Sequence, residues 1–160
     1  IKSWPVIGHL SSKTGTIFIR RGDSRDNDSV IRKMKDYIGL RKKIVIFPEG
    51  RIGDGKQIKK FHSKLLESVV GDNMKTQPVL IHYPIDFPRD NSNDLSICWA
   101  DKSQTLLNIS IKCMSRLRTT VLVKFHETIQ CNQDPYELAR QSFNLVKSSR
   151  DQVINTNLNE

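Results

Sequence analysis

A short apolar run that breaks into a polar loop constrains this chain more than any other feature. Three β-favouring residues and a phenylalanine occupy positions 44–47, and Pro48 ends the run. We expect a buried strand here, because a short apolar run bounded by turn residues is typical of one. Glu49, Gly50 and Arg51 follow directly, and sites in α/β folds tend to lie at the carboxyl ends of strands. The segment therefore predicts a strand tip that presents a carboxylate, a flexible backbone and a guanidinium.

A second polar strand tip lies upstream. The run Thr16-Ile-Phe-Ile19 has the residues of a strand, and Arg20 and Arg21 stand at its end before Gly22. A guanidinium fork is well shaped to pair with a phosphate. Two such tips in one small domain predict a pocket for a polar or phosphorylated ligand.

Strand-like and helix-like segments alternate along the chain. We expect strands at 16–19, 43–47, 78–83, 95–99 and 119–125. We expect helices from residue 26 or 28 to 39, at 61–70, at 104–116 and at 136–153, the last preceded by Asp134 as a cap and by Pro135 at its first position. This alternation argues for a single α/β domain with a central mixed sheet flanked by helices.

Composition and charge fit a globular domain with anionic partners. The chain has 160 residues, 37% of them hydrophobic and 27% charged, and no apolar run approaches the roughly 20 residues that span a bilayer. A net charge of +9 favours nucleic acid, anionic lipid head groups or phosphorylated small molecules. Cys98, Cys113 and Cys131 show neither a zinc spacing nor a disulfide framework, which predicts reduced thiols.

Four segments together resemble the sequence blocks of one enzyme family. Their order and spacing are similar to those of the glycerolipid acyltransferases of the lysophosphatidic-acid acyltransferase type, and the segments are Trp4–Gly8, Gly15–Arg21, Phe47–Gly50 and Gln77–Ile81. The resemblance covers roughly residues 4–85, and only a compatible strand–helix pattern continues beyond residue 90. It implies a glycerol-phosphate acyltransferase-like fold, with an acyltransferase domain over residues 1–155 that lacks its N-terminal part and a frayed tail over 156–160.

The resemblance implies transfer of a fatty acyl group from acyl-CoA or acyl-carrier protein to a lysophospholipid or a related hydroxyl in phospholipid biosynthesis. In that family a His-x4-Asp pair supplies a general base and the carboxylate that orients it. Here the fifth positions after the four histidines hold Thr14, Glu67, Phe87 and Cys131, so the pair is absent from this chain. We expect the pair to lie upstream of residue 1 and this chain alone to be inactive. The resemblance implies no metal and no cofactor besides the acyl thioester co-substrate.

The blocks that are present imply the acceptor side of a substrate site. Arg21 matches the arginine of the second block and would pair with a phosphate. Glu49 would accept hydrogen bonds from the acceptor hydroxyl or hold a basic group, and Gly50 would allow close backbone approach. Phe47 and Pro48 complete this block, and Arg51 is the sixth member of the predicted substrate-binding set.

Arg51 departs from the family pattern, in which many members have Thr after the Gly and Arg next. Either Arg51 is that arginine after a one-residue deletion, or residues 50–55 match a subgroup that reads Gly-Thr-Thr-x-Asp-Gly, with Arg51 and Ile52 in place of both threonines. The later Phe61-His-Ser-Lys64 favours the second alignment. Whether Arg51 binds substrate therefore depends on the alignment.

Two other functions compete with acyl transfer. A non-catalytic lipid-binding remnant of the same fold would keep these blocks without the His-x4-Asp pair. A basic nucleic-acid-binding module would use the charge, but no helix-turn-helix, zinc finger or aromatic-bearing RNA motif stands in the sequence. The acyltransferase interpretation implies a lysophospholipid acceptor, an acyl thioester donor and attachment to the cytoplasmic face of a membrane, and it implies no nucleic acid.

Overall fold

The computed structural model describes residues 7–18, 24–50, 53–71, 74–99, 104–131 and 134–156. The helices are α1 (Ile7–Lys13), α2 (Ser24–Gly39), α3 (Leu106–Met114) and α4 (Pro135–Asn155), with a short 3-10 helix η1 (Lys64–Ser68). The described strands pair into two-stranded antiparallel sheets: β1 (Lys75–Thr76) with β6 (Ile129–Gln130), β2 (Val79–His82) with β5 (Leu122–Phe125), and β3 (Pro84–Asp86) with β4 (Asp90–Asn93). Among these helices, none is both long enough and apolar enough to cross a membrane.

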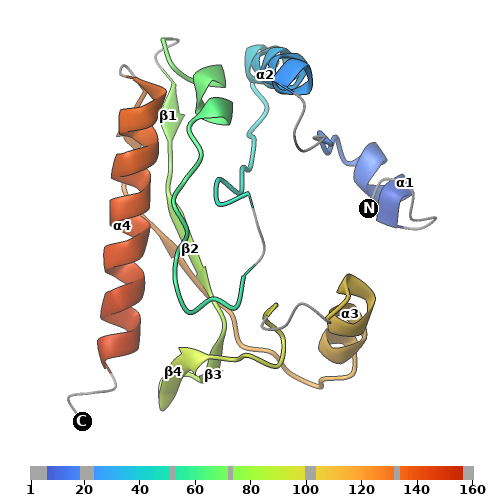
Figure 1. The fold of residues 1–160 in the computed structure, drawn as a ribbon, viewed down its shortest axis with the longest axis vertical. Coiled ribbons are helices and arrows are strands. Elements are labelled where there is room, and N and C mark those ends of the chain that lie inside the picture. The colour runs from blue at the N-terminus through green and yellow to red at the C-terminus, as the bar shows by residue number, and fades with distance from the viewer. Residues whose placement is uncertain are drawn as a thin grey trace.

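Helix α4 runs along one side of the molecule and organises the elements beside it (Figure 1). It contacts β2, β4 and η1. The β3–β4 hairpin lies at the same end of the molecule as the C-terminal end of α4, and α2 lies near the opposite end (Figure 1). Helices α1 and α3 stand on the side away from α4. The molecule is therefore built around α4 and the strands that it covers.

One face of the β2–β5 sheet is buried and the other is open. Leu80 and His82 are buried, whereas Ile81 between them is exposed, as is its partner Val123 on β5. Successive side chains of a strand point to opposite faces, so the buried pair marks the covered face. The register places Val79 opposite Phe125 at the other end of the pairing.

The main core lies where η1, the start of α4 and the end of β6 meet. Leu66, Cys131, Leu138 and Ala139 form its buried cluster. Partly buried side chains from other segments pack around this cluster: Ile46, Phe61, Val69, Met74 and Ile129. The loop segments that carry Ile46 and Phe61 are thus fixed to the core by one apolar side chain each.

The helix predictions are largely confirmed. Val30, Ile31 and Met34 are buried on one face of α2, which ends at residue 39 as predicted. The helix already begins at residue 24, so the predicted start at 26 or 28 is wrong. Asp134 is the N-cap of α4 and Pro135 its first residue, in agreement with the sequence. The helix expected at 61–70 is only the short η1, which covers 64–68.

Three predicted strands are wrong. Residues 16–18 and 43–47 have no assigned secondary structure, and residue 19 lies outside the described ranges. Positions 43–47 still alternate, with Ile44 and Ile46 half-buried, Val45 80% exposed and Phe47 75% exposed. A strand also needs a neighbouring strand to complete its hydrogen bonds, and no described segment pairs with this one.

The third misplaced strand, at 95–99, is a turn preceded by the β3–β4 hairpin. The carboxylate of Asp94 accepts a hydrogen bond from the amide of Ser96 at 3.0 Å. Such a side-chain bond stabilises a turn and competes with strand pairing. The expected central mixed sheet is therefore replaced, in the described residues, by helices and small antiparallel sheets.

Candidate functional site

The Phe-Pro-Glu-Gly block forms a tight turn at the end of an extended segment. The amide of Gly50 donates to the carbonyl of Phe47 at 3.3 Å, which closes the turn over Pro48 and Glu49. Gly50 has a φ of +63°, a conformation that residues with a Cβ adopt at a cost. The sequence block is thus one compact structural unit.

The close approach of His62 also favours glycine at position 50. A Cβ added to Gly50 would lie 3.1 Å from Cδ2 and 3.4 Å from Nε2 of His62. The imidazole therefore faces the glycine directly, so both the backbone conformation and the available space favour glycine here. His62 belongs to the segment Phe61-His-Ser-Lys64, which favours the second alignment of Arg51.

Two hydrogen bonds tie the turn to the segment 59–62. The carboxylate of Glu49 accepts from the amide of Lys59 at 2.9 Å, and the carbonyl of Pro48 accepts from the amide of His62 at 2.9 Å. A carboxylate that accepts from a backbone N–H makes a stronger bond than a neutral acceptor does. Glu49 therefore has a structural role, which is to close the loop that follows the block.

The middle of that loop is held from the far end of the chain. Gly55, with a φ of +72°, presents its carbonyl to Nε and Nη2 of Arg150 on α4, at 3.3 and 3.1 Å. Nη2 of Arg150 also donates to the carbonyl of Lys56, and Nδ2 of Asn93 donates to that of Gly55. Sequence reasoning missed Arg150 and Asn93, since no local pattern links residues so far apart. We call the loop 53–58 with these two anchors the glycine-loop clamp.

Four of the six predicted substrate-binding residues are described by the structure, and these four are consecutive in the sequence. Phe47, Pro48, Glu49 and Gly50 lie in one turn, with the ring of Phe47 exposed. Arg21 and Arg51 lie outside the described residues, so their convergence with Glu49 stays a prediction.

His62 and His82 have structural surroundings. Glu67, which follows His62 at the His-x4-carboxylate spacing, instead accepts from Nζ of Lys64 at 3.0 Å. His82 is buried, and its Nε2 is 2.7 Å from the carbonyl oxygen of Asn91. Within the described ranges, no group of three His, Cys, Asp or Glu side chains is arranged to hold a metal ion.

An ion pair connects the start of the 94–99 turn to Arg116, which lies just beyond the end of α3. Arg116 donates to the carboxylate of Asp94, and Ser96 bonds to both residues. The hydrogen bond from Arg116 is the main cause of a lowered pKa at Asp94; burial opposes it, and the weaker hydrogen bonds from Ser96 add to the lowering. Burial raises the pKa of the nearby Cys98 thiol, so this cysteine is held in its protonated form.

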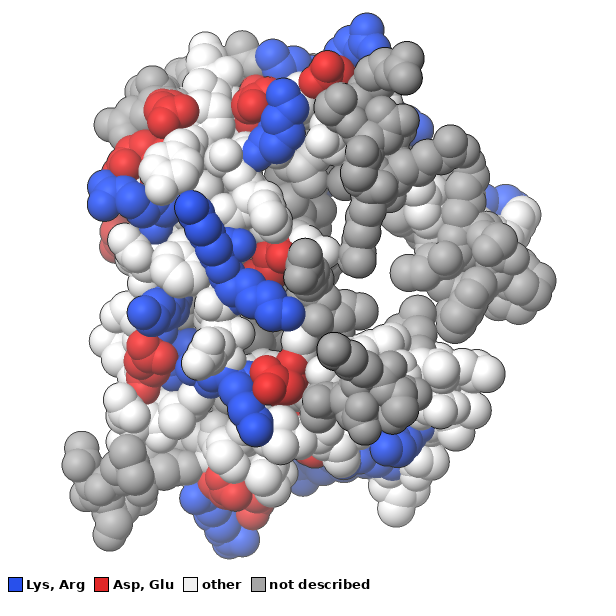
Figure 2. All heavy atoms as spheres, in the orientation of Figure 1, with Lys and Arg blue, Asp and Glu red and all other residues white. Residues whose placement is uncertain are grey.

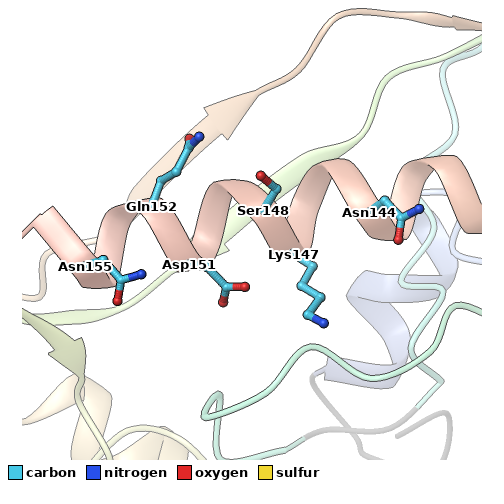
Figure 3. A pocket seen from close by; sticks show the side chains of 6 residues that line it. All are labelled: Asn144, Lys147, Ser148, Asp151, Gln152 and Asn155. Carbon is cyan, nitrogen blue, oxygen red and sulfur yellow. The ribbon is translucent and has the colours of Figure 1, made fainter.

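The polar face of α4 forms a shallow hollow that we do not assign to the site. Six side chains of this one helix line it, and they project outward around the helix (Figure 3): Asn144, Lys147, Ser148, Asp151, Gln152 and Asn155. A hollow lined by a single helix face lacks the convergent groups from several elements that a ligand site needs.

Comparisons with known proteins bear on this turn. Residues 1–82 match the family described as Acyltransferase, and this match includes the whole Phe-Pro-Glu-Gly turn. The chain belongs to the acyltransferase family. No solved structure matches it, so the glycerol-phosphate acyltransferase-like fold and the domain bounds 1–155 stay predictions.

Curated relatives extend the acyltransferase match. A lyso-ornithine lipid O-acyltransferase of Pseudomonas aeruginosa is 30% identical over 148 residues, which is 92% of this chain and 55% of that protein. A 1-acyl-sn-glycerol-3-phosphate acyltransferase of Neisseria gonorrhoeae is 31% identical over 83 residues, or 52% of this chain and 32% of that protein. A lysophospholipid acyltransferase of Xenopus tropicalis is 27% identical over 139 residues, or 82% of this chain and 24% of that protein. The chain thus spans about half the length of the first relative and less of the others.

Proposed function

We propose that this chain is part of an acyltransferase that moves a fatty acyl group from a thioester to the free hydroxyl of a single-tailed lipid. The observation that carries the proposal is the family match over residues 1–82, in which the matched Phe-Pro-Glu-Gly block is folded into an anchored turn. The thioester is acyl-CoA or acyl-carrier protein.

The acceptor side of the reaction would lie around that turn. The relatives are named for lyso-ornithine lipid and for 1-acyl-sn-glycerol-3-phosphate, and both names describe a lipid with one acyl chain missing. Glu49 would hold the acceptor hydroxyl or a basic group close to it, and Arg21 would pair with an acceptor phosphate. Arg51 would add a second cation under the alignment that makes it the arginine of the block. A lyso-ornithine acceptor has no phosphate, so it would depend less on Arg21.

The place of the reaction would be the cytoplasmic surface of a membrane, where single-tailed lipids reside. The chain carries a net charge of +9, and Lys and Arg side chains lie over α4 and the segment beside it, with fewer Asp and Glu side chains among them (Figure 2). Each Lys or Arg near an anionic surface contributes about 1 kcal/mol of attraction.

The experiment is an acyl-transfer assay on the full-length natural protein, because this chain contains no His-x4-Asp pair. Radiolabelled palmitoyl-CoA and palmitoyl-acyl-carrier protein are each offered with lysophosphatidate and with lyso-ornithine lipid. We expect a doubly acylated product from at least one combination, and the productive pair identifies donor and acceptor. If none of the four donor and acceptor combinations gives a doubly acylated product, the proposal is wrong.

The 160-residue chain serves as the matched comparison in the same assay. We expect it to give no product, since the family's general base is absent from it. Product from the 160-residue chain alone would show that another group acts as the base.

A further inference from the structure

A second hollow lies between the start of α4 and the segment that leads into η1. Its volume is about 360 Å³, within the range of small-molecule sites. Its apolar lining consists of Phe61, Tyr136, Ala139 and Phe143, and its polar lining of Lys60, Arg140 and Asn144. Unlike the polar hollow of Figure 3, it is lined from two separate segments and is mainly apolar.

The walls of this hollow are held in place by packing. The rings of Phe61 and Phe143 meet edge to face, with centroids 5.7 Å apart and planes at 79°, a favourable arrangement for aromatic pairs. Phe61 also packs against the core cluster, to which Ala139 belongs. The apolar lining is therefore preformed and does not require a ligand to assemble it.

Cationic groups stand beside the aromatic walls. Nζ of Lys60 lies 5.2 Å from the ring centroid of Tyr136, and Nζ of Lys147 lies 5.9 Å from that of Phe143. Arg140 is already paired with Glu137 through two hydrogen bonds. Among the described carboxylates, none forms an ion pair with Lys60 or Lys147. The hollow thus offers a ligand the positive charge of Lys60 beside an aromatic surface.

We propose that this hollow binds a single-chain anionic amphiphile, with its hydrocarbon tail against the aromatic walls and its carboxylate or phosphate on Lys60. An apolar lining favours the chain through the hydrophobic effect, and an ammonium beside the opening favours an anionic head group. A free fatty acid and a lysophospholipid share this chemistry. A neutral amphiphile would satisfy the lining and leave Lys60 without an anionic partner.

A ligand in this hollow would contact the backbone segment that anchors the Phe-Pro-Glu-Gly turn. Lys60 and Phe61 lie between the two residues whose amides bond to Glu49 and to Pro48. A ligand in the hollow therefore contacts the same short segment that anchors the turn. The binding itself does not depend on the proposed acyl transfer, and a protein without that activity would still bind the amphiphile.

The test is a calorimetric titration of the 160-residue chain with palmitate, with 16-carbon lysophosphatidate and with neutral palmitoylglycerol, each kept below its aggregation threshold. The variants are Lys60→Glu, Lys60→Arg and Tyr136→Ser, with Lys112→Glu on α3 as the control for net charge. All the replaced side chains are exposed, and circular dichroism checks that each variant keeps its fold.

We expect one-to-one binding of at least one anionic probe, weakened by about tenfold or more in Lys60→Glu. Tyr136→Ser also weakens binding, while Lys60→Arg and Lys112→Glu bind as the unaltered chain does. Binding of palmitate alone identifies a carboxylate ligand, and binding of lysophosphatidate alone a phosphate ligand. Four results would each overturn the proposal. Palmitoylglycerol could bind as well as the anionic probes, or Lys112→Glu could weaken binding as much as Lys60→Glu does. Neither anionic probe could bind, or the chain could bind only to anionic vesicles.

Discussion

Arg150 gives the sharpest test of how the glycine-rich loop is held. Its guanidinium donates to the carbonyls of Gly55 and Lys56, and its side chain is only 13% exposed. Replacing Arg150 by Gln removes the charged fork and leaves Asn93 as the remaining donor to Gly55. The change acts on the loop from the opposite end of the chain, since Arg150 belongs to α4.

The size of the effect follows from the bonds that are lost. A hydrogen bond that involves a charged group contributes about 1.5–3 kcal/mol, so we expect Arg150→Gln to lower the free energy of unfolding by about 2 kcal/mol. For a chain of this length each kcal/mol corresponds to about 2–4 °C in the melting temperature, hence a loss of about 4–8 °C. Urea titration followed by circular dichroism measures the first quantity, and a thermal melt measures the second.

Two further variants make this test specific. Arg150→Lys keeps the charge without the fork and should recover only part of the loss. Arg140→Gln, on the same helix, breaks an exposed pair with Glu137 and should cost under about 0.5 kcal/mol. If Arg150→Gln lowers the free energy of unfolding no more than Arg140→Gln does, Arg150 does not hold the loop in the glycine-loop clamp and the reasoning fails.

Three other outcomes are expected. Gly50→Ala should lower the free energy of unfolding by about 1–3 kcal/mol, because Gly50 has a positive φ and the imidazole of His62 faces it. Gly39 has open space around it, so Gly39→Ala should change the free energy of unfolding by no more than about 0.5 kcal/mol. Equal effects of the two variants in urea titration would contradict this prediction. Asp94→Asn should remove a stabilisation that is present above the ordinary pKa of an aspartate and is lost as the pH falls through the lowered pKa of Asp94. The variant and the unaltered chain should therefore converge in stability at acid pH. A constant difference in stability from neutral pH to pH 2 would refute the role of Arg116. Arg21→Ala in the full-length protein should raise the KM for lysophosphatidate, and an effect confined to the acyl donor would show that the two ends of the site are exchanged.

Local pattern was enough to predict the long helices. The buried stripe of Val30, Ile31 and Met34 has helical spacing, and Asp134 with Pro135 marks the start of α4 in the sequence itself. These features depend on neighbours within a few residues, which is why reading the chain locates them.

The sheet arrangement could not be predicted in the same way. The apolar run at 44–47 predicted a buried strand, whereas the structure has a segment, unpaired among the described residues, that packs Ile46 against the core and leaves Val45 and Phe47 exposed. Pairing depends on which other segment lies alongside, and the pattern within 43–47 contains no information about that. The β3–β4 hairpin was missed because its own residues do not favour a strand: Asp90, Asn91 and Asn93 are typical of turns.

The candidate site was predictable as a block but not in its anchoring. The sequence predicted a buried strand that breaks into a polar loop at Pro48. The structure has a turn over Pro48 and Glu49 at this point, but the segment before it is not a strand. The sequence could not predict that the carboxylate of Glu49 accepts from the amide of Lys59, or that Arg150 reaches Gly55. Both contacts join residues that come together only through the tertiary fold.

The most direct test of the account compares Glu49→Gln with Glu49→Ala in the full-length protein, assayed for acyl transfer to its productive acceptor. Gln keeps a side-chain oxygen for the amide of Lys59 but has no charge, whereas Ala removes the anchor as well. Loss of the charge weakens the bond to Lys59 by about 1 kcal/mol, so we expect Glu49→Gln to melt about 2–4 °C below the unaltered protein and well above Glu49→Ala. We expect Glu49→Gln to lose about a hundredfold in kcat/KM, as removal of a group that interacts with the reacting atoms does. Normal turnover in Glu49→Gln together with loss in Glu49→Ala would show that Glu49 only closes the loop, which would contradict its role in the acceptor site.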